Sequence, residues 1–327
     1  MTTPPPQDLP ADMLRVHGFA SLQPGPRLLV MGGVHGDETC GTEAIERVVA
    51  KIDAGRLRLA RGQLTLVPIA NPLARRLGRR EGERNLNRLF QPSAPGATPM
   101  DYEARLTDLL CPLLARHQVL LDLHSFQSQG DAFAMIGPRD NQGSLEPFAR
   151  AFEEGRLALH LGTTRVVEGW LEIYAAGLAQ RAGGRPATAA ELAFGWGTNE
   201  YMRSQGGYGV TLECGQHRDP AAPEVAYRAI RAALRLLGMV EGEEAPPEPP
   251  APALLRLVSV TDRLHEEDEF VRDWATFDPV ARGEPIGLRA DGSLLQAERD
   301  GFIVFPNEAA APGTEWFYLA VESDRRL

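Results

Sequence analysis

The chain has few cysteines, no long apolar run and fewer basic than acidic residues. Its 3 cysteines are widely spaced, and their odd number does not suit a disulfide framework but suits a reducing compartment. No apolar run approaches the roughly 18 to 20 residues that span a bilayer. Residues 1–10 lack a basic start followed by an apolar core, so no secretory signal is predicted. We therefore expect a cytoplasmic protein with no membrane partner.

The charge balance argues against general nucleic-acid binding. The 327 residues include 34 basic and 44 acidic side chains, which give a formal net charge of −10. A nucleic-acid binder needs a basic face that displaces counterions from phosphates. We expect no nucleic-acid partner, although a local cluster of arginines could still bind a small acidic molecule. At 43% hydrophobic residues, the chain is an ordinary soluble protein with a sizeable core.

Apolar patterns along the first 240 residues predict strands that alternate with helices. Strands are predicted near 14–19, 27–31, 63–69, 119–123, 133–136 and 209–212. Helices are predicted at 39–52, 101–117, 145–154 and 223–237. This alternation indicates an α/β fold with a mostly parallel sheet flanked by helices. No elements can be assigned with the same clarity between about 157 and 208.

An acidic, proline-rich segment at 241–253 divides the chain. Proline excludes a regular helix there, so we expect a semi-rigid linker. Short strand patterns separated by turns follow it and predict a small C-terminal β domain. The predicted domains are therefore 1–240 and 254–327.

A turn after the apolar run at 28–31 carries His35 and Glu38. Side chains three residues apart on a helical turn share one face, so an imidazole and a carboxylate can bind the same metal ion. His124 follows another apolar run, and parallel strands bring such positions to one edge of the sheet. His124 could therefore be a third ligand, or instead a hydrogen-bonded core residue.

Two further groups could serve hydrolysis at such a metal. Glu213 follows an apolar strand, where partial burial can raise its pKa enough for a general base, although a salt-bridged carboxylate is the alternative. The segment 73–90 is rich in arginine, and its Arg79-Arg80 and Asn87-Arg88 pairs could stabilise an oxyanion and bind a carboxylate. The alternative is a polar surface loop, and either Arg79 or Arg80 could face the metal.

Five motifs in order resemble those of the succinylglutamate desuccinylase/aspartoacylase family, whose enzymes are related to the zinc carboxypeptidases. They are Gly33-Val34-His35-Gly36-Asp37-Glu38, Asn71-Pro72, Asn85-Leu86-Asn87-Arg88, Asp122-Leu123-His124 and Thr211-Leu212-Glu213. The resemblance implies a zinc carboxypeptidase-like fold with a C-terminal β domain. It implies one zinc ion per chain on His35, Glu38 and His124. It further implies Glu213 as general base and Arg80 as the group that polarises the scissile carbonyl. Asn87 and Arg88 would bind a substrate carboxylate.

The activity that the resemblance implies is zinc-dependent hydrolysis of the amide bond of a small anionic N-acyl amino acid. A zinc carboxypeptidase acting on a short peptide is one alternative, because both substrates place an amide beside a carboxylate. A non-catalytic protein that binds a small acid is another. The chain departs from the family pattern at Asp37 and Asn85, and its segment 124–129 looks closer to carboxypeptidases. The acyl group and the oligomeric state, a homo-oligomer included, stay open.

Overall fold

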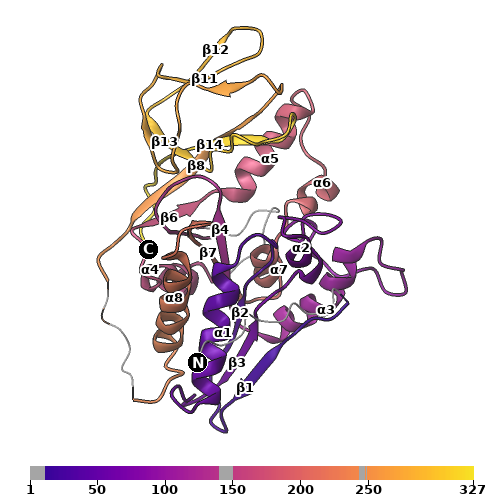
Figure 1. The fold of residues 1–327 in the computed structure, drawn as a ribbon, viewed down its shortest axis with the longest axis vertical. Helices are drawn as coiled ribbons and strands as arrows, with labels where there is room; N and C mark the ends of the chain where they lie inside the picture. Colours follow the sequence, from indigo (N-terminus) through magenta and orange to yellow (C-terminus); the bar gives the residue numbers. More distant parts are fainter. Residues whose placement is uncertain (1–11, 140–149, 243–246, 248) are drawn as a thin grey trace.

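An eleven-stranded sheet forms the centre of the computed structural model, which describes residues 12–139, 150–242, 247 and 249–327 (Figure 1). In their order across the sheet, the strands are β1 (His17–Ala20), β3 (Gln63–Val67), β2 (Arg27–Met31), β4 (Val119–Phe126), β7 (Tyr208–Gln216), β5 (Phe133–Met135), β6 (Arg165–Glu168), β8 (Ala253–Asp262), β14 (Glu315–Glu322), β13 (Gly301–Val304) and β10 (Pro279–Val280). The neighbours β3, β2, β4 and β7 run parallel, whereas β1 and β5 are antiparallel to β3 and β7. The predicted fold class, α/β with a mostly parallel core, is confirmed.

Helices cover both faces of this parallel core. They are α1 (Cys40–Asp53), α2 (Pro72–Leu77), α3 (Tyr102–Arg116), α4 (Ala151–His160), α5 (Trp170–Arg181), α6 (Ala189–Phe194), α7 (Thr198–Ser204) and α8 (Ala222–Leu236). Leu28 and Val30 of β2 pack in one apolar cluster with residues of α1, α4 and α8. Leu29 and Met31, on the opposite face, pack in a second cluster with residues of α3 and α7. Burial on both faces explains why the central strands are continuously apolar.

The C-terminal strands continue the same sheet. β8 runs parallel to β6 and antiparallel to β14, so that residues beyond 253 are joined to the earlier strands by backbone hydrogen bonds. Aromatic side chains pack across this junction, and the rings of Phe133 and Phe277 meet edge to face at 4.9 Å. A separate three-stranded sheet consists of β12 (Leu294–Gln296), β11 (Pro285–Leu288) and β9 (Glu269–Phe270). These strands lie at one end of the molecule (Figure 1).

Several element boundaries differ from those predicted. The helix expected over 145–154 is α4, which begins only at Ala151, and 140–149 lie outside the described residues. β4 and β7 extend further than predicted, which places His124 and Glu213 inside strands rather than after them. The segment 157–208, for which no elements were predicted, contains β6 and the helices α5 to α7.

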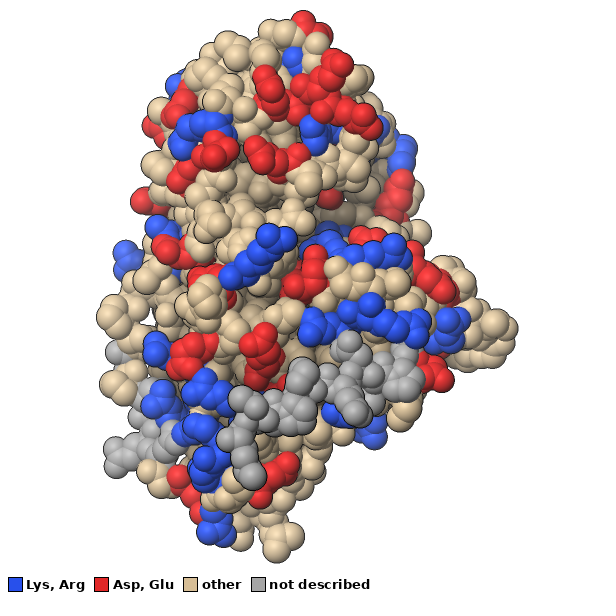
Figure 2. Space-filling model, viewed as in Figure 1, with Lys and Arg blue, Asp and Glu red and all other residues tan. Residues whose placement is uncertain are grey.

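Acidic and basic side chains are unevenly spread on the face in Figure 2, with acidic groups crowded over the C-terminal strands.

Within the described ranges, none of the helices has the length and apolar character needed to cross a membrane.

Candidate functional site

The turn between β2 and α1 brings His35 and Glu38 together. Gly33 adopts φ +60°, a left-handed conformation that glycine tolerates well, and it turns the chain away from β2. The backbone at Gly36 packs directly on Ala74 of α2, and a Cβ at Gly36 would overlap with it. This constrained turn buries both side chains, each 2% exposed. His35 Nδ1 lies 2.7 Å from Glu38 Oε1.

His124 of β4 meets the other oxygen of the same carboxylate. Its Nδ1 lies 2.9 Å from Glu38 Oε2, and the backbone N–H of Ser125 donates to that oxygen at 3.1 Å. The rings of His35 and His124 have their centroids 5.0 Å apart. The two imidazoles and the carboxylate form a group of potential metal ligands whose donor atoms all lie within 4.8 Å of one another. The structure thus brings together the three predicted ligands from β4 and the turn after β2.

The Nε2 atom of each imidazole, on the side of the ring away from Glu38, contacts a side-chain oxygen. His124 Nε2 lies 3.0 Å from Asp122 Oδ2, and His35 Nε2 lies 3.1 Å from Asn85 Oδ1. Each ring therefore lies between two oxygens, one of them from Glu38. Burial lowers the pKa of His124, but the Asp122 and Glu38 carboxylates on either side of the ring outweigh this effect and raise that pKa well above its usual range. Burial and the nearby Arg80 guanidinium lower the pKa of His35 to about 4, which keeps this imidazole neutral near pH 7.

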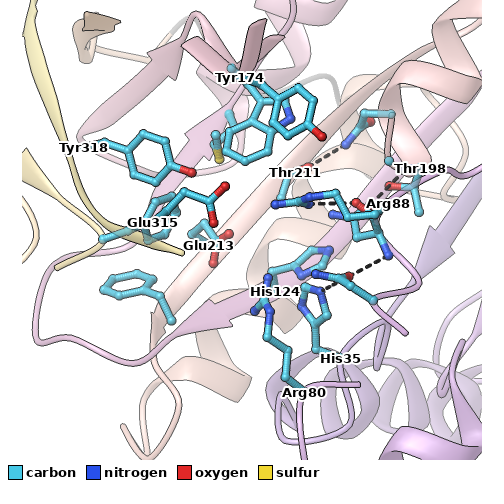
Figure 3. A pocket seen from close by; sticks show the side chains of 18 of the residues that line it. His35, Arg80, Arg88, His124, Tyr174, Thr198, Thr211, Glu213, Glu315 and Tyr318 are labelled. Atoms are coloured by element: carbon cyan, nitrogen blue, oxygen red, sulfur yellow. Dashed lines mark hydrogen bonds between the residues drawn. The ribbon is translucent and has the colours of Figure 1, made fainter. Parts of the chain in front are cut away.

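Glu213 lies beside His124, because the two residues are paired in register across β7 and β4. Its side chain is directed into the same cavity as both imidazoles (Figure 3). Its Oε2 is buried and has no hydrogen-bond partner among the described residues. Burial, together with the negative charge of Glu38, raises the pKa of Glu213 well above its usual range. A carboxylate of this kind can accept a proton near neutral pH.

Of the two adjacent arginines, Arg80 is the one that reaches the group of potential metal ligands. Its Nη1 lies 3.3 Å from Glu38 Oε1, and its side chain is 47% exposed. Arg79 turns away and donates to the carbonyl oxygens of Glu81 and Gly82 at 2.8 and 2.6 Å. The guanidinium of Arg80 therefore stands at the rim of the cavity, beside the histidines.

Asn87 and Arg88 line the cavity from a turn rather than from an extended segment. Asn85 Oδ1 accepts from the N–H of Asn87 at 2.9 Å, and this hydrogen bond stabilises the turn. Asn87 Oδ1 accepts from the backbone N–H of Thr198 at 3.0 Å. Arg88 donates to the carbonyl of Asn87 at 2.8 Å and has no carboxylate partner among the described residues. Its guanidinium remains available to a ligand.

The cavity has a volume of about 800 Å³, and its outer wall comes from residues that the sequence analysis did not identify. Tyr174 of α5 and Glu315 and Tyr318 of β14 line it together with the predicted residues (Figure 3). Residues three apart in a regular strand face opposite sides, but the pairing of β14 with β8 shifts between Glu315 and Phe317. No local sequence pattern reveals this wall, because it depends on the pairing of β14 and β8.

His217, which was not among the predicted site residues, also lines the cavity. Its Nδ1 lies 2.8 Å from Ser125 Oγ. With Asp37 and Glu38 it forms a second group whose potential ligand atoms lie within 4.8 Å of one another. The position of His217, four residues after Glu213 and directly after the carboxyl end of β7, could have indicated that it lies near the site.

Comparisons with known proteins point to one family. A family model of the succinylglutamate desuccinylase/aspartoacylase catalytic domain matches residues 24–165. The succinylglutamate desuccinylase of Burkholderia thailandensis is 30% identical over 304 residues, which cover 90% of this chain and 80% of that protein. The Burkholderia pseudomallei protein of the same name is 28% identical over 330 residues, which cover 96% and 84%.

Solved structures agree with the fold described above. The product-bound ectoine utilization protein EutE from Ruegeria pomeroyi has a TM-score of 0.67 at 20% identity, and the match covers 94% of this chain and 88% of that one. A succinylglutamate desuccinylase/aspartoacylase from Rhodobacter sphaeroides has a TM-score of 0.67 at 18% identity, with 93% and 87% covered. The similarity in fold therefore includes the C-terminal strands.

Proposed function

Since the chain belongs to the succinylglutamate desuccinylase/aspartoacylase family, we propose that it is a zinc-dependent hydrolase that cleaves the amide bond of an N-acyl amino acid. The observation that carries this proposal is the convergence of His35, Glu38 and His124, whose donor atoms lie within 4.8 Å of one another. A buried carboxylate, Glu213, lines the same cavity. Metal ligands and a proton acceptor therefore stand side by side.

The donor set fits a divalent ion such as zinc. The Nδ1 atoms of His35 and His124 lie 2.7 and 2.9 Å from the two oxygens of the Glu38 carboxylate. Once the Nδ1 atoms have lost their protons, these two nitrogens and the carboxylate can bind one cation, which takes the place of the protons. Two imidazoles and a carboxylate are also the ligands of many catalytic zinc sites, which leave one position open. When bound, zinc would activate a water molecule and polarise a carbonyl group.

Glu213 supplies the proton acceptor in this proposal. Its Oε2 would take a proton from the attacking water and return it to the leaving nitrogen of the amide. Its raised pKa suits both steps, because the carboxylate must be deprotonated first and protonated afterwards. The Arg80 guanidinium, on the Glu38 side of the cavity, would hold the carbonyl oxygen as negative charge develops there.

Arg88 and Asn87 bind the substrate in this proposal. The guanidinium of Arg88 has no carboxylate partner among the described residues, so it can form a bidentate pair with a substrate carboxylate. The side-chain oxygen of Asn87 already accepts from Thr198, which fixes the orientation of its amide group. A substrate held in this way presents the amide beside the carboxylate to the metal-ligand group.

Metal analysis and turnover test the proposal. The purified protein should bind about one zinc ion per chain. The zinc-loaded protein should hydrolyse members of a panel of N-acyl amino acids faster than short peptides. The Glu213→Gln variant should keep its zinc and lose at least about 10²-fold in turnover. Glu298→Gln is the matched control, because Glu298 is exposed and does not line the cavity. Full activity in Glu213→Gln, or a protein that binds no zinc, would contradict the proposal.

A further inference from the structure

The cavity has fewer available positive charges than its five arginines suggest. Three of these arginines are paired with carboxylates that do not line the cavity. The pairs are Arg84 with Asp101 at 2.8 Å, Arg181 with Asp262 at 2.6 Å and Arg203 with Glu154 at 2.9 Å. Among the described residues, this leaves Arg80 and Arg88 for an anionic ligand, and Arg80 already contacts Glu38.

Carboxylates, in contrast, are in excess at the outer wall. Arg181 makes two short hydrogen bonds to Asp262, at 2.7 and 2.6 Å, and a longer one to Glu315, at 3.5 Å. Arg181, Asp262 and Glu315 together carry one net negative charge, and Arg88 is a further cation that acts on Tyr174 and Tyr318. Glu172, in the first turn of α5, also lines the cavity and has no hydrogen bond or ion pair to any described residue.

Aromatic rings stand next to these carboxylates. Trp170 stacks on Tyr174 with ring centroids 6.2 Å apart, and it meets Tyr318 at 5.9 Å. Tyr174, Tyr318 and Glu315 lie around the same part of the cavity (Figure 3). Aromatic faces attract cations, and the Arg88 guanidinium already lies 4.9 Å from the centre of the Trp170 ring. Carboxylates and aromatic faces together favour an ammonium or guanidinium group.

This arrangement fits poorly with a substrate that carries several carboxylates. Succinylglutamate has three, and the Arg88 guanidinium can pair with one of them. A second carboxylate that extends toward Tyr174 and Tyr318 would approach Glu315, and a like charge at short distance disfavours binding.

We infer that the substrate is an N-acyl amino acid with one carboxylate and a cationic side chain, the carboxylate on Arg88 and the cation beside Glu315, Tyr174 and Tyr318. This inference rests on the proposed hydrolase function and names its substrate class. Glu315 is a specificity-determining residue in this proposal, because it would contact the side chain of the substrate and not the amide bond that is cleaved.

Steady-state kinetics with three acyl compounds of similar size test the inference. Nα-acetyllysine carries a cationic side chain, Nα-acetylnorleucine is its neutral analogue, and N-acetylglutamate adds a carboxylate. The zinc-loaded protein should show kcat/KM about tenfold or more higher for the lysine compound than for the norleucine compound, and lowest for the glutamate compound. Glu315→Gln should bring the lysine-to-norleucine ratio close to 1, mainly through a higher KM for the lysine compound. Glu315→Asp should restore part of the ratio, and Glu298→Gln should leave it as it is.

Other outcomes separate this inference from the proposed function. A higher kcat/KM for the glutamate or norleucine compound, or an unchanged ratio in Glu315→Gln, overturns the inference but leaves the hydrolase proposal intact. If no member of the wider panel of N-acyl amino acids is hydrolysed, the hydrolase proposal fails, and calorimetry with the same three acetyl compounds still decides the charge preference. Tighter binding of Nα-acetyllysine to Glu213→Gln supports the cationic site, and equal or weaker binding overturns it.

Discussion

Replacing Asp122 with asparagine should weaken metal binding without removing any metal ligand. Asp122 is fully buried, and its Oδ2 accepts from His124 Nε2 at 3.0 Å and from Thr198 Oγ1 at 2.5 Å. An asparagine side chain has the same shape and can keep one oxygen toward His124. The negative charge is lost. The Asp122 carboxylate would then no longer orient the His124 ring as strongly or increase the basicity of Nδ1 toward a metal ion.

The expected size of the effect follows from the role of such partners in metal sites. Loss of a group that orients a ligating histidine typically costs 10- to 100-fold in metal affinity, which corresponds to about 1.4 to 2.7 kcal/mol. Competition with a chromogenic chelator at pH 7.5 would measure the zinc Kd of both proteins. Thermal unfolding of the metal-free proteins would show whether the variant folds.

A matched surface variant completes the experiment. Asp131→Asn removes a carboxylate that is 74% exposed and pairs with Arg165 outside the cavity, so its zinc Kd should match that of the parent protein. An Asp122→Asn variant that folds and keeps the parent Kd would refute the role assigned to Asp122.

Three other perturbations have defined outcomes. Zinc at 1,000 times its Kd should add about 4.1 kcal/mol to the free energy of unfolding, seen as a higher Tm, and an unchanged Tm would contradict a metal site. Arg203→Met leaves the fully buried Glu154 without its ion pair, so urea unfolding should show a loss of about 3–5 kcal/mol, and parent-like stability would count against this role. Burial opposes ionisation of Asp268, but backbone N–H groups and Arg289 lower its pKa to about 2, below the usual 3.8. This stabilisation is present above the unfolded pKa and is lost as pH falls from about 4 toward 2. The stability gap to Asp268→Asn should therefore shrink between pH 5 and 2, and a constant gap would contradict it.

Local sequence patterns predicted the inner part of the candidate site. The spacing of His35 and Glu38 is a property of one turn, and the apolar runs before His124 and Glu213 identify neighbouring strands of a parallel sheet. Parallel strands bring their carboxyl ends to one edge, so these residues could be placed near one another without coordinates. Predicting their convergence therefore needed only the strand assignments.

The outer wall could not be predicted, because it depends on pairing between distant segments. Glu315 and Tyr318 reach the cavity through the contacts of β14 with β8 and of β8 with β6, and an irregularity in β14 sets which side chains face inward. Arg79 and Arg80 are equivalent in the sequence, and backbone carbonyls at 81 and 82 bind the first of them. The sequence around α5 is rich in glycine and alanine and shows no clear helical pattern. The start of α6 could have been found, because Thr188 and Glu191 form a capping box there.

Anomalous diffraction from a crystal of zinc-loaded protein would test the metal centre most directly. We predict one strong peak at the zinc edge between the Nδ1 atoms of His35 and His124 and the carboxylate of Glu38, with Glu213 beside it. Saturating zinc that gives no peak there, or a peak bound by other residues, would contradict the account.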